Sequence, residues 1–246
     1  MRIRANLYLV ASGKMGFDWT HPSDCNVYLI ESDGELALID SGTGESVNHI
    51  LSYIESIGYS IQQLKKIFLT HIHADHAGGA AELKNKTGAA VYVHKEAGEI
   101  LASGDEDAID LTTAKRSGFY PVKYKFKACE ADHLLKDGDL FNVGLLTVKV
   151  LETPGHSRFD LSFIISEKEE TYLFSGDTVF YGGKISMINS SDFDLQSLSG
   201  SVNKLTNYSC DLLLPGHHQP ALRNGHEHIA AANETFSNMG VPTNIN

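Results

Sequence analysis

The sequence predicts an α/β fold in which two β-sheets stack face to face, with helices on their outer sides. The first observation is an order of elements that occurs twice along the chain: hairpin, acidic residue, helix, strand, histidine. The second is that 246 residues with 42% hydrophobic content can bury a substantial core. Two such halves would bury one face of each sheet and bring the residues at the strand ends to one rim.

The first copy of this order begins with a hairpin over residues 25–39 that turns at Asp33-Gly34 and ends at Asp40. A helix follows, because apolar residues recur at helical spacing until Gly58. A strand then leads to His71. The apolar face of the helix consists of Val47, Ile50, Leu51, Ile54 and Ile57.

The second copy begins with a hairpin over residues 161–174 and continues to Asp177. A helix with Leu195, Leu198, Val202 and Leu205 on one face comes next, followed by a strand that leads to His217. Residues 225–239 are expected to form one short final helix. The repeat is inferred from the pattern of elements, since sequence identity between the copies is negligible.

The most informative stretch is a His-x-His-x-Asp-His cluster that starts at His71, directly after an apolar strand. His71 and His73 are two residues apart, so in extended chain both side chains point the same way and can bind one ion. Asp75 and His76 lie where the chain turns into a small-residue segment, and they can face a second ion. Neutral imidazole nitrogen and carboxylate oxygen are ligands of divalent metals. The cluster therefore predicts two metal ions.

Three later motifs also place a ligand-type residue just beyond an apolar strand. They are Thr-Pro-Gly-His ending at His156, Gly-Asp-Thr around Asp177, and Pro-Gly-His ending at His217. In each motif a glycine or proline turns the backbone. In sheet-based folds, catalytic and binding sites commonly lie in the loops that follow the ends of strands.

Together these residues resemble the metallo-β-lactamase superfamily and, within it, the glyoxalase II-like thioesterases. The Asp40-Ser41-Gly42 turn matches the first motif of that family, and the resemblance runs from about residue 25 to about residue 220. It implies a four-layer αβ/βα sandwich that forms a single domain over residues 1–246.

The resemblance also implies a dinuclear metal centre, with zinc expected and iron or manganese also suited to the ligands. The implied ligands are His71, His73 and His156 for the first ion, Asp75, His76 and His217 for the second, and Asp177 for both. Asp75 and Asp177 are the implied catalytic carboxylates. A metal-bridging hydroxide would attack the substrate carbonyl, because coordination lowers the pKa of water to about 7. No cysteine is close in sequence to the histidines, which argues against a zinc-thiolate site.

Two residues outside the ligand set are candidates for supporting roles. Asp40 either caps the helix that starts near Glu45 or orients a ligand histidine, and we prefer the second role because its repeat counterpart is Asp177. Tyr181 follows Asp177 by four residues. It would bind substrate by donating to an oxyanion, or else it packs.

Residues 97–133 break the repeat and are too long for an ordinary connection, so we expect an insertion with its own helix and a loop near the site. We expect Lys115 and Arg116 to attract an anionic substrate. The alternative is a solvated excursion without a role. The cations of the segment are Lys115, Arg116, Lys123, Lys125 and Lys127.

Composition limits the partners and the location. A net charge of −11 and a pI near 5.5 argue against a nucleic-acid partner. The three cysteines are widely spaced and fit reduced thiols in a cytoplasmic protein. No export signal is visible at the N-terminus, and no segment is apolar enough to cross a membrane. We expect a cytoplasmic protein with a small-molecule substrate, and the sequence leaves the oligomeric state open.

The leading functional hypothesis is hydrolysis of a small thioester. An acyl-homoserine-lactone-type lactonase would share every metal ligand, and a phosphodiesterase would bind phosphate at the same di-metal site. A persulfide dioxygenase with a single iron is a further alternative, because the sequence does not reveal how many metal sites fill. A β-lactamase is disfavoured because Asp177 stands where those enzymes involve cysteine, and a flavin-linked carrier because His73 stands where glutamate is usual. The acidic chain disfavours a nuclease. A non-catalytic binding module is disfavoured because no ligand is missing.

Overall fold

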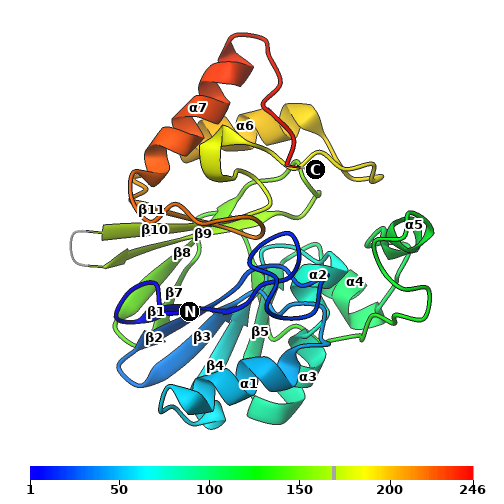
Figure 1. Cartoon of the computed structure of the whole chain (residues 1–246), viewed down its shortest axis with the longest axis vertical. Coiled ribbons are helices and arrows are strands. Elements are labelled where there is room, and N and C mark those ends of the chain that lie inside the picture. Colours follow the sequence, from blue (N-terminus) through cyan, green and yellow to red (C-terminus); the bar gives the residue numbers. More distant parts are fainter. Residues whose placement is uncertain (168–169, 246) are drawn as a thin grey trace. The chain divides into compact units, whose positions relative to one another are not determined.

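The computed structural model describes residues 1–167 and 170–245, and the chain divides into two compact units. The first unit comprises Met1–Leu135 with Val143–Leu145, and the second comprises Lys136–Asn142 with Leu146–Asn246. Each unit is built on one β-sheet and carries its own helices (Figure 1).

The sheet of the first unit has six strands that follow one another in chain order. Its strands are β1 (Leu7–Ala11), β2 (Val27–Ser32), β3 (Glu35–Ile39), β4 (Leu64–Phe68), β5 (Ala90–His94) and β6 (His133–Leu135). The first three strands pair antiparallel, and β3 to β6 pair parallel. Parallel neighbours end at the same edge of the sheet, so the loops that follow β3 and β4 start side by side.

The hairpin between β2 and β3 is the one predicted from the sequence. Asp33 and Gly34 have φ angles of 51° and 77°, the left-handed conformation at both positions that a two-residue hairpin turn requires. Glycine adopts it without the steric penalty of a Cβ atom. This turn fixes the register that pairs Ser32 with Glu35.

The helices of the first unit are α1 (Val47–Ser56), the 3₁₀ helix η1 (Ile61–Gln63), α2 (Ala74–Ala77), α3 (Ala80–Thr87), α4 (Gly98–Ser103) and α5 (Leu111–Arg116). The predicted apolar face of α1 is confirmed from Val47 to Ile54, whereas Ile57 lies at its C-cap. The segment 97–133 contains two short helices, α4 and α5, followed by a long connection to β6.

The sheet of the second unit has five strands in the order β11-β10-β9-β8-β7. They are β7 (Leu140–Val143), β8 (Leu146–Glu152), β9 (Leu161–Glu167), β10 (Glu170–Gly176) and β11 (Leu212–Pro215). β8, β9 and β10 pair antiparallel, while β11 is parallel to β10. Hairpin, helix and parallel strand thus occur in both units, which confirms the predicted repeat of elements.

Helices α6 (Leu195–Leu205) and α7 (Gly225–Ser237) and the 3₁₀ helix η2 (Tyr181–Gly183) complete the second unit. The core of this unit joins Val202 of α6 and Ile229 of α7 to Leu173 and Leu213 of the sheet. The N-cap of α6 is Asp194, whose carboxylate accepts the N–H of Ser197 at 2.8 Å and stabilises the first turn of the helix. Among the residues that the structure describes, no helix has both the length and the apolar character that crossing a bilayer demands.

One turn of the second unit packs directly against α6. Gly155, the residue before His156, has a φ of 143°, and a Cβ atom there would lie 2.3 Å from the Cα atom of Leu198. Its carbonyl also accepts the N–H of Asp194 at 2.9 Å. The glycine therefore lets the backbone that carries His156 approach α6 closely.

We expect Gly155→Ala to lower the free energy of unfolding by roughly 1–3 kcal/mol, because the added methyl group overlaps the backbone of α6. Urea unfolding followed by circular dichroism measures this change. The matched control is Gly200→Ala on α6, where a Cβ atom meets nothing within 4 Å. That variant should be as stable as the parent or gain up to about 1 kcal/mol. Equal stability of the two variants would contradict the expectation.

Candidate metal centre

The first unit gathers the His-x-His-x-Asp-His cluster at the end of β4. Helix α2 begins directly after His73, so Asp75 and His76 lie on its first turn. The ring of His71 is centred 4.6 Å from that of His73 and 4.0 Å from that of His76. An oxygen of Asp75 lies 3.7 Å from Nε2 of His76. The four predicted ligands of this unit therefore form one cluster, buried except at His73, which is half-buried.

Asp40, directly after β3, is hydrogen-bonded to the loop and to one histidine of this cluster. Its Oδ1 accepts the backbone N–H of Thr70 at 2.8 Å, and its Oδ2 lies 2.8 Å from Nδ1 of His76. A carboxylate only accepts, so Nδ1 of His76 carries the proton and Nε2 is the nitrogen with a lone pair for a metal. The N-cap of α1 is Ser46 rather than Asp40. Of the two roles considered for Asp40, these contacts fit the orientation of a ligand histidine.

Two tyrosines of the segment 97–133 reach the loops around this cluster. The hydroxyl of Tyr120 donates to Oδ1 of Asp75 at 2.8 Å, and that of Tyr124 donates to the carbonyl of Thr43 at 2.7 Å. Their rings stack with centroids 5.3 Å apart. Burial and the charge of Asp75 raise the pKa of Tyr120 well above its usual value, so the hydroxyl keeps its proton. Sequence reasoning missed both residues because it considered only the cations of this segment.

Cys25 also lies in this cluster. Its sulfur is within 4.8 Å of a carboxylate oxygen of Asp40 and a ring nitrogen of His76. The expectation that no cysteine is near the histidines holds along the sequence but is wrong in space. Burial raises the pKa of Cys25 to about 12, which keeps the thiol protonated.

The second unit forms its own cluster from His156, Asp177 and His217, all of them buried. Asp177 follows β10 and His217 follows β11, and the register that pairs Gly176 with Pro215 brings the two side chains together. Oδ2 of Asp177 lies 3.5 Å from Nε2 of each histidine. Nδ1 of His156 lies 3.3 Å from the carbonyl oxygen of Ser186, so Nε2 is again the nitrogen that faces the carboxylate.

The turn that carries His156 is held by a buried carboxylate. Asp160 accepts the backbone N–H of Ser157 at 2.6 Å and bonds its hydroxyl at 2.7 Å, while the carbonyl of Asp160 accepts the N–H of Thr153 at 2.9 Å. Burial raises the pKa of Asp160 well above its usual value, against the effect of the bonds from Ser157. These bonds fix the loop on both sides of His156.

The donor sets of both units fit divalent metal ions. Ligand atoms about 2.0–2.2 Å from a tetrahedral ion lie about 3.3–3.6 Å from one another. The carboxylate–imidazole separation is 3.7 Å in the first cluster, and both separations are 3.5 Å in the second. Imidazole nitrogen and carboxylate oxygen are the ligands that zinc, iron and manganese accept. Each unit thus offers a group of side chains at ligand-to-ligand distance.

The predicted substrate-binding residues have the following surroundings. Tyr181 is 43% exposed, and its ring is centred 4.3 Å from that of His228. Lys115 forms an ion pair with Glu106, so its charge is already compensated. Arg116 is exposed at the end of α5. The roles of these three residues in substrate binding stay predictions.

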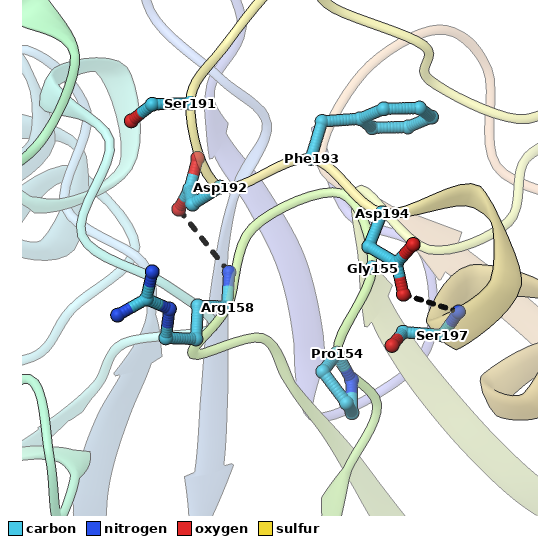
Figure 2. Close-up of a pocket in the computed structure, with 8 residues that line it drawn as sticks. All are labelled: Pro154, Gly155, Arg158, Ser191, Asp192, Phe193, Asp194 and Ser197. Carbon is cyan, nitrogen blue, oxygen red and sulfur yellow. Dashed lines mark hydrogen bonds between the residues drawn. The ribbon is translucent and has the colours of Figure 1, made fainter.

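A cavity of about 290 Å³ lies in the second unit beside the turn that carries His156 (Figure 2). It is lined by Pro154, Gly155, Arg158, Ser191, Asp192, Phe193, Asp194 and Ser197. The carboxylate of Asp192 accepts the backbone N–H of Arg158 at 3.1 Å, and that of Asp194 caps α6. Within residues 1–167 and 170–245, the guanidinium of Arg158 forms no ion pair and lies 5.8 Å from the ring centre of Phe159.

Comparison with known proteins gives the family. The sequence model of one protein family, the Metallo-beta-lactamase superfamily, matches residues 21–217. The human acyl-coenzyme A thioesterase MBLAC2 is 28% identical over 65% of this chain and 60% of its own length, so the chain spans about three fifths of that relative. A hydroxyacylglutathione hydrolase of Rhodopseudomonas palustris is 34% identical over 48% of this chain and 35% of its own.

Among solved structures, the MIM-2 metallo-beta-lactamase superposes with a TM-score of 0.74 at 22% identity. The match covers 97% of this chain and 87% of that protein. At this level of identity the likeness concerns the fold alone. It confirms the α/β fold class with two sheets that the sequence predicts.

Proposed function

Because the chain belongs to the metallo-beta-lactamase superfamily, we propose that it is a metal-dependent hydrolase of small acyl thioesters, similar to glyoxalase II. The observation that carries the proposal is the ligand-to-ligand spacing of imidazoles and carboxylates in both clusters. The thioester class is supported by relatives that are named acyl-coenzyme A thioesterase and hydroxyacylglutathione hydrolase. Lactones and phosphodiesters are the alternative substrates that the same ligand types allow.

The proposed centre would hold two divalent ions, with zinc expected and iron or manganese also suited to the donors. The first ion takes His71, His73 and His156, the second takes Asp75, His76 and His217, and Asp177 is shared. When bound, such ions polarise an acyl carbonyl and make water acidic enough to serve as a nucleophile near neutral pH. Asp75 and Asp177 therefore act as catalytic carboxylates through the ions they hold.

The residues of the chain orient the ligands and set the charge of the site. Asp40 holds His76 by Nδ1, and the carbonyl of Ser186 faces Nδ1 of His156, so each ring presents Nε2. Asp75 and Asp177 bring two negative charges against the four positive charges of two ions. The site stays cationic and stabilises the negative charge that develops on the acyl oxygen and on the leaving thiolate.

The first test is metal content together with a substrate panel. Protein purified without chelator should contain well over one equivalent of transition metal by elemental analysis. It should hydrolyse small acyl thioesters faster than lactones or phosphodiesters, because thioesters match the proposed class. Removal of the metal should abolish hydrolysis, and added zinc should restore it. Full activity after complete chelation would refute the proposed function.

The second test addresses Asp177. Asp177→Ala removes a proposed shared ligand, so metal occupancy should fall and kcat should drop by at least about 100-fold, more than is typical for the loss of a supporting residue. The control is Asp137→Ala in the same unit, whose carboxylate pairs with Lys204. That variant should keep its metal and its turnover. Full occupancy in Asp177→Ala would exclude the shared role.

The cavity beside His156 suggests where the acyl group is recognised. Its lining contains Arg158 and Phe193 as well as Asp192 and Asp194, whose carboxylates accept the backbone N–H groups of Arg158 and Ser197. Arg158 is therefore the lining group that could bind a carboxylate at the end of a short acyl group. An acyl group of this kind would place its carbonyl toward the histidine turn and its charge on Arg158. This orientation is part of the proposed function.

We expect Arg158→Ala to raise KM about fivefold for a thioester whose acyl group ends in a carboxylate, the effect of an exposed charge pair. The KM of the corresponding methyl ester should stay the same. Steady-state kinetics on both substrates at low and high salt measure the difference. Arg223→Ala is the matched control, since Arg223 is exposed in the same unit and does not line the cavity. Equal effects on both substrates would assign Arg158 to the scaffold.

A further inference from the structure

A residue outside the family motifs touches a proposed metal ligand. Tyr120 lies between α5 and β6, 45 residues after Asp75 in the chain, and its hydroxyl donates to Oδ1 of Asp75 at 2.8 Å. Tyr120 is 5% exposed and Asp75 is 6% exposed, so bulk water does not compete for this bond. The bond is thus a buried tertiary contact to the carboxylate of the ligand cluster.

We propose that Tyr120 is a positioning residue that fixes the carboxylate of Asp75 for metal binding. The bond engages Oδ1, while Oδ2 is the oxygen that lies 3.7 Å from Nε2 of His76. The χ2 angle of aspartate is intrinsically broad, and a hydrogen bond to one carboxylate oxygen narrows it. The inference rests on the proposed function, because it takes Asp75 to be a ligand.

The chemistry of the donor suits this role. A tyrosine hydroxyl is neutral, so it orients Asp75 without cancelling the negative charge that attracts a cation. A lysine or arginine at the same place would form an ion pair with the carboxylate and compete with the metal. The nearby cation Lys115 is instead paired with Glu106 of the same segment.

The segment that carries Tyr120 is anchored independently of Asp75. Tyr124 donates to the carbonyl of Thr43 at 2.7 Å and stacks on the ring of Tyr120. The backbone N–H of Phe126 is bound by Glu106 at 3.1 Å. Removal of the Tyr120 hydroxyl therefore leaves the ring and its backbone supported. The two tyrosines form a matched pair, since both are buried hydroxyl donors of one segment and only one of them binds a proposed ligand.

The experiment compares Tyr120→Phe with Tyr124→Phe in the full chain. Zinc affinity is measured by competition with a chromophoric chelator, so the readout does not depend on turnover. We expect Tyr120→Phe to lower the affinity for one of the two zinc ions by about 10- to 100-fold. This is the usual effect of removing a residue that hydrogen-bonds to a metal ligand. Tyr124→Phe should bind both ions as the parent does. Urea unfolding of the metal-free proteins checks that both variants fold.

A second arm separates positioning from general support. If Tyr120 acts through Asp75, then adding Tyr120→Phe to Asp75→Ala should cause no further loss of zinc affinity. Parental affinity in Tyr120→Phe, equal losses in both tyrosine variants, or additive losses with Asp75→Ala would each overturn the inference. In all three cases a parent that still binds two ions leaves the proposed function intact. A parent protein that binds no zinc would instead overturn the proposed function itself, and this inference with it.

Discussion

The loop that carries most of the candidate ligands in the first unit depends on the buried carboxylate of Asp40. An unpaired buried carboxylate costs on the order of several kcal/mol, so its oxygens must find donors. They find them on Thr70 and His76, which lie beyond the end of the neighbouring strand. Asp40 itself has a φ of 64°, a conformation that costs a residue with a Cβ atom roughly 1–2 kcal/mol. The bonds to both partners offset this strain and set the path of the loop.

The two units use the same topological position for different chemistry. In each, an aspartate follows one strand of a parallel pair and a histidine motif follows the other, since β3 pairs with β4 and β10 with β11. Asp40 lies 2.8 Å from the Nδ1 atom of its histidine, a hydrogen bond, whereas Asp177 lies 3.5 Å from Nε2 of His217, a ligand-to-ligand distance. The same arrangement of strands thus places an aspartate that orients a ligand histidine in the first unit. In the second unit it places an aspartate that is itself a candidate ligand.

The parts of the structure that local patterns determine could be predicted from the sequence. Strand β3 has the predicted bounds, the turn at Asp33-Gly34 is where the two residues place it, and the candidate ligands follow the strand ends. The missed features are contacts between distant segments. Tyr120 is 45 residues from Asp75, and Cys25 is far from His76 along the chain. Neither periodicity nor a short motif carries information about such pairs.

The ion pairs of the segment 97–133 are also contacts that the sequence does not predict. The predicted role of Lys115 and Arg116 in attracting substrate stays a prediction, and the structure adds that Lys115 is paired with Glu106. A basic run in a sequence shows how many charges a segment has and leaves open where each one is compensated. The tyrosines of that segment lie against the ligand loop instead, because an aromatic ring gains by burial and its hydroxyl can still serve a polar site.

Polar bonds hold the backbone around the candidate ligands. The hydroxyl of Ser41 donates to the carbonyl of His76 at 2.7 Å, and Asp160 fastens the turn of His156 through Ser157. Such bonds add little net stability, since the unfolded chain bonds equally to water, but they specify direction. The apolar cores of the two sheets supply the stability. The loops at the strand ends are therefore free to present buried imidazoles and carboxylates in a geometry that packing alone would not favour.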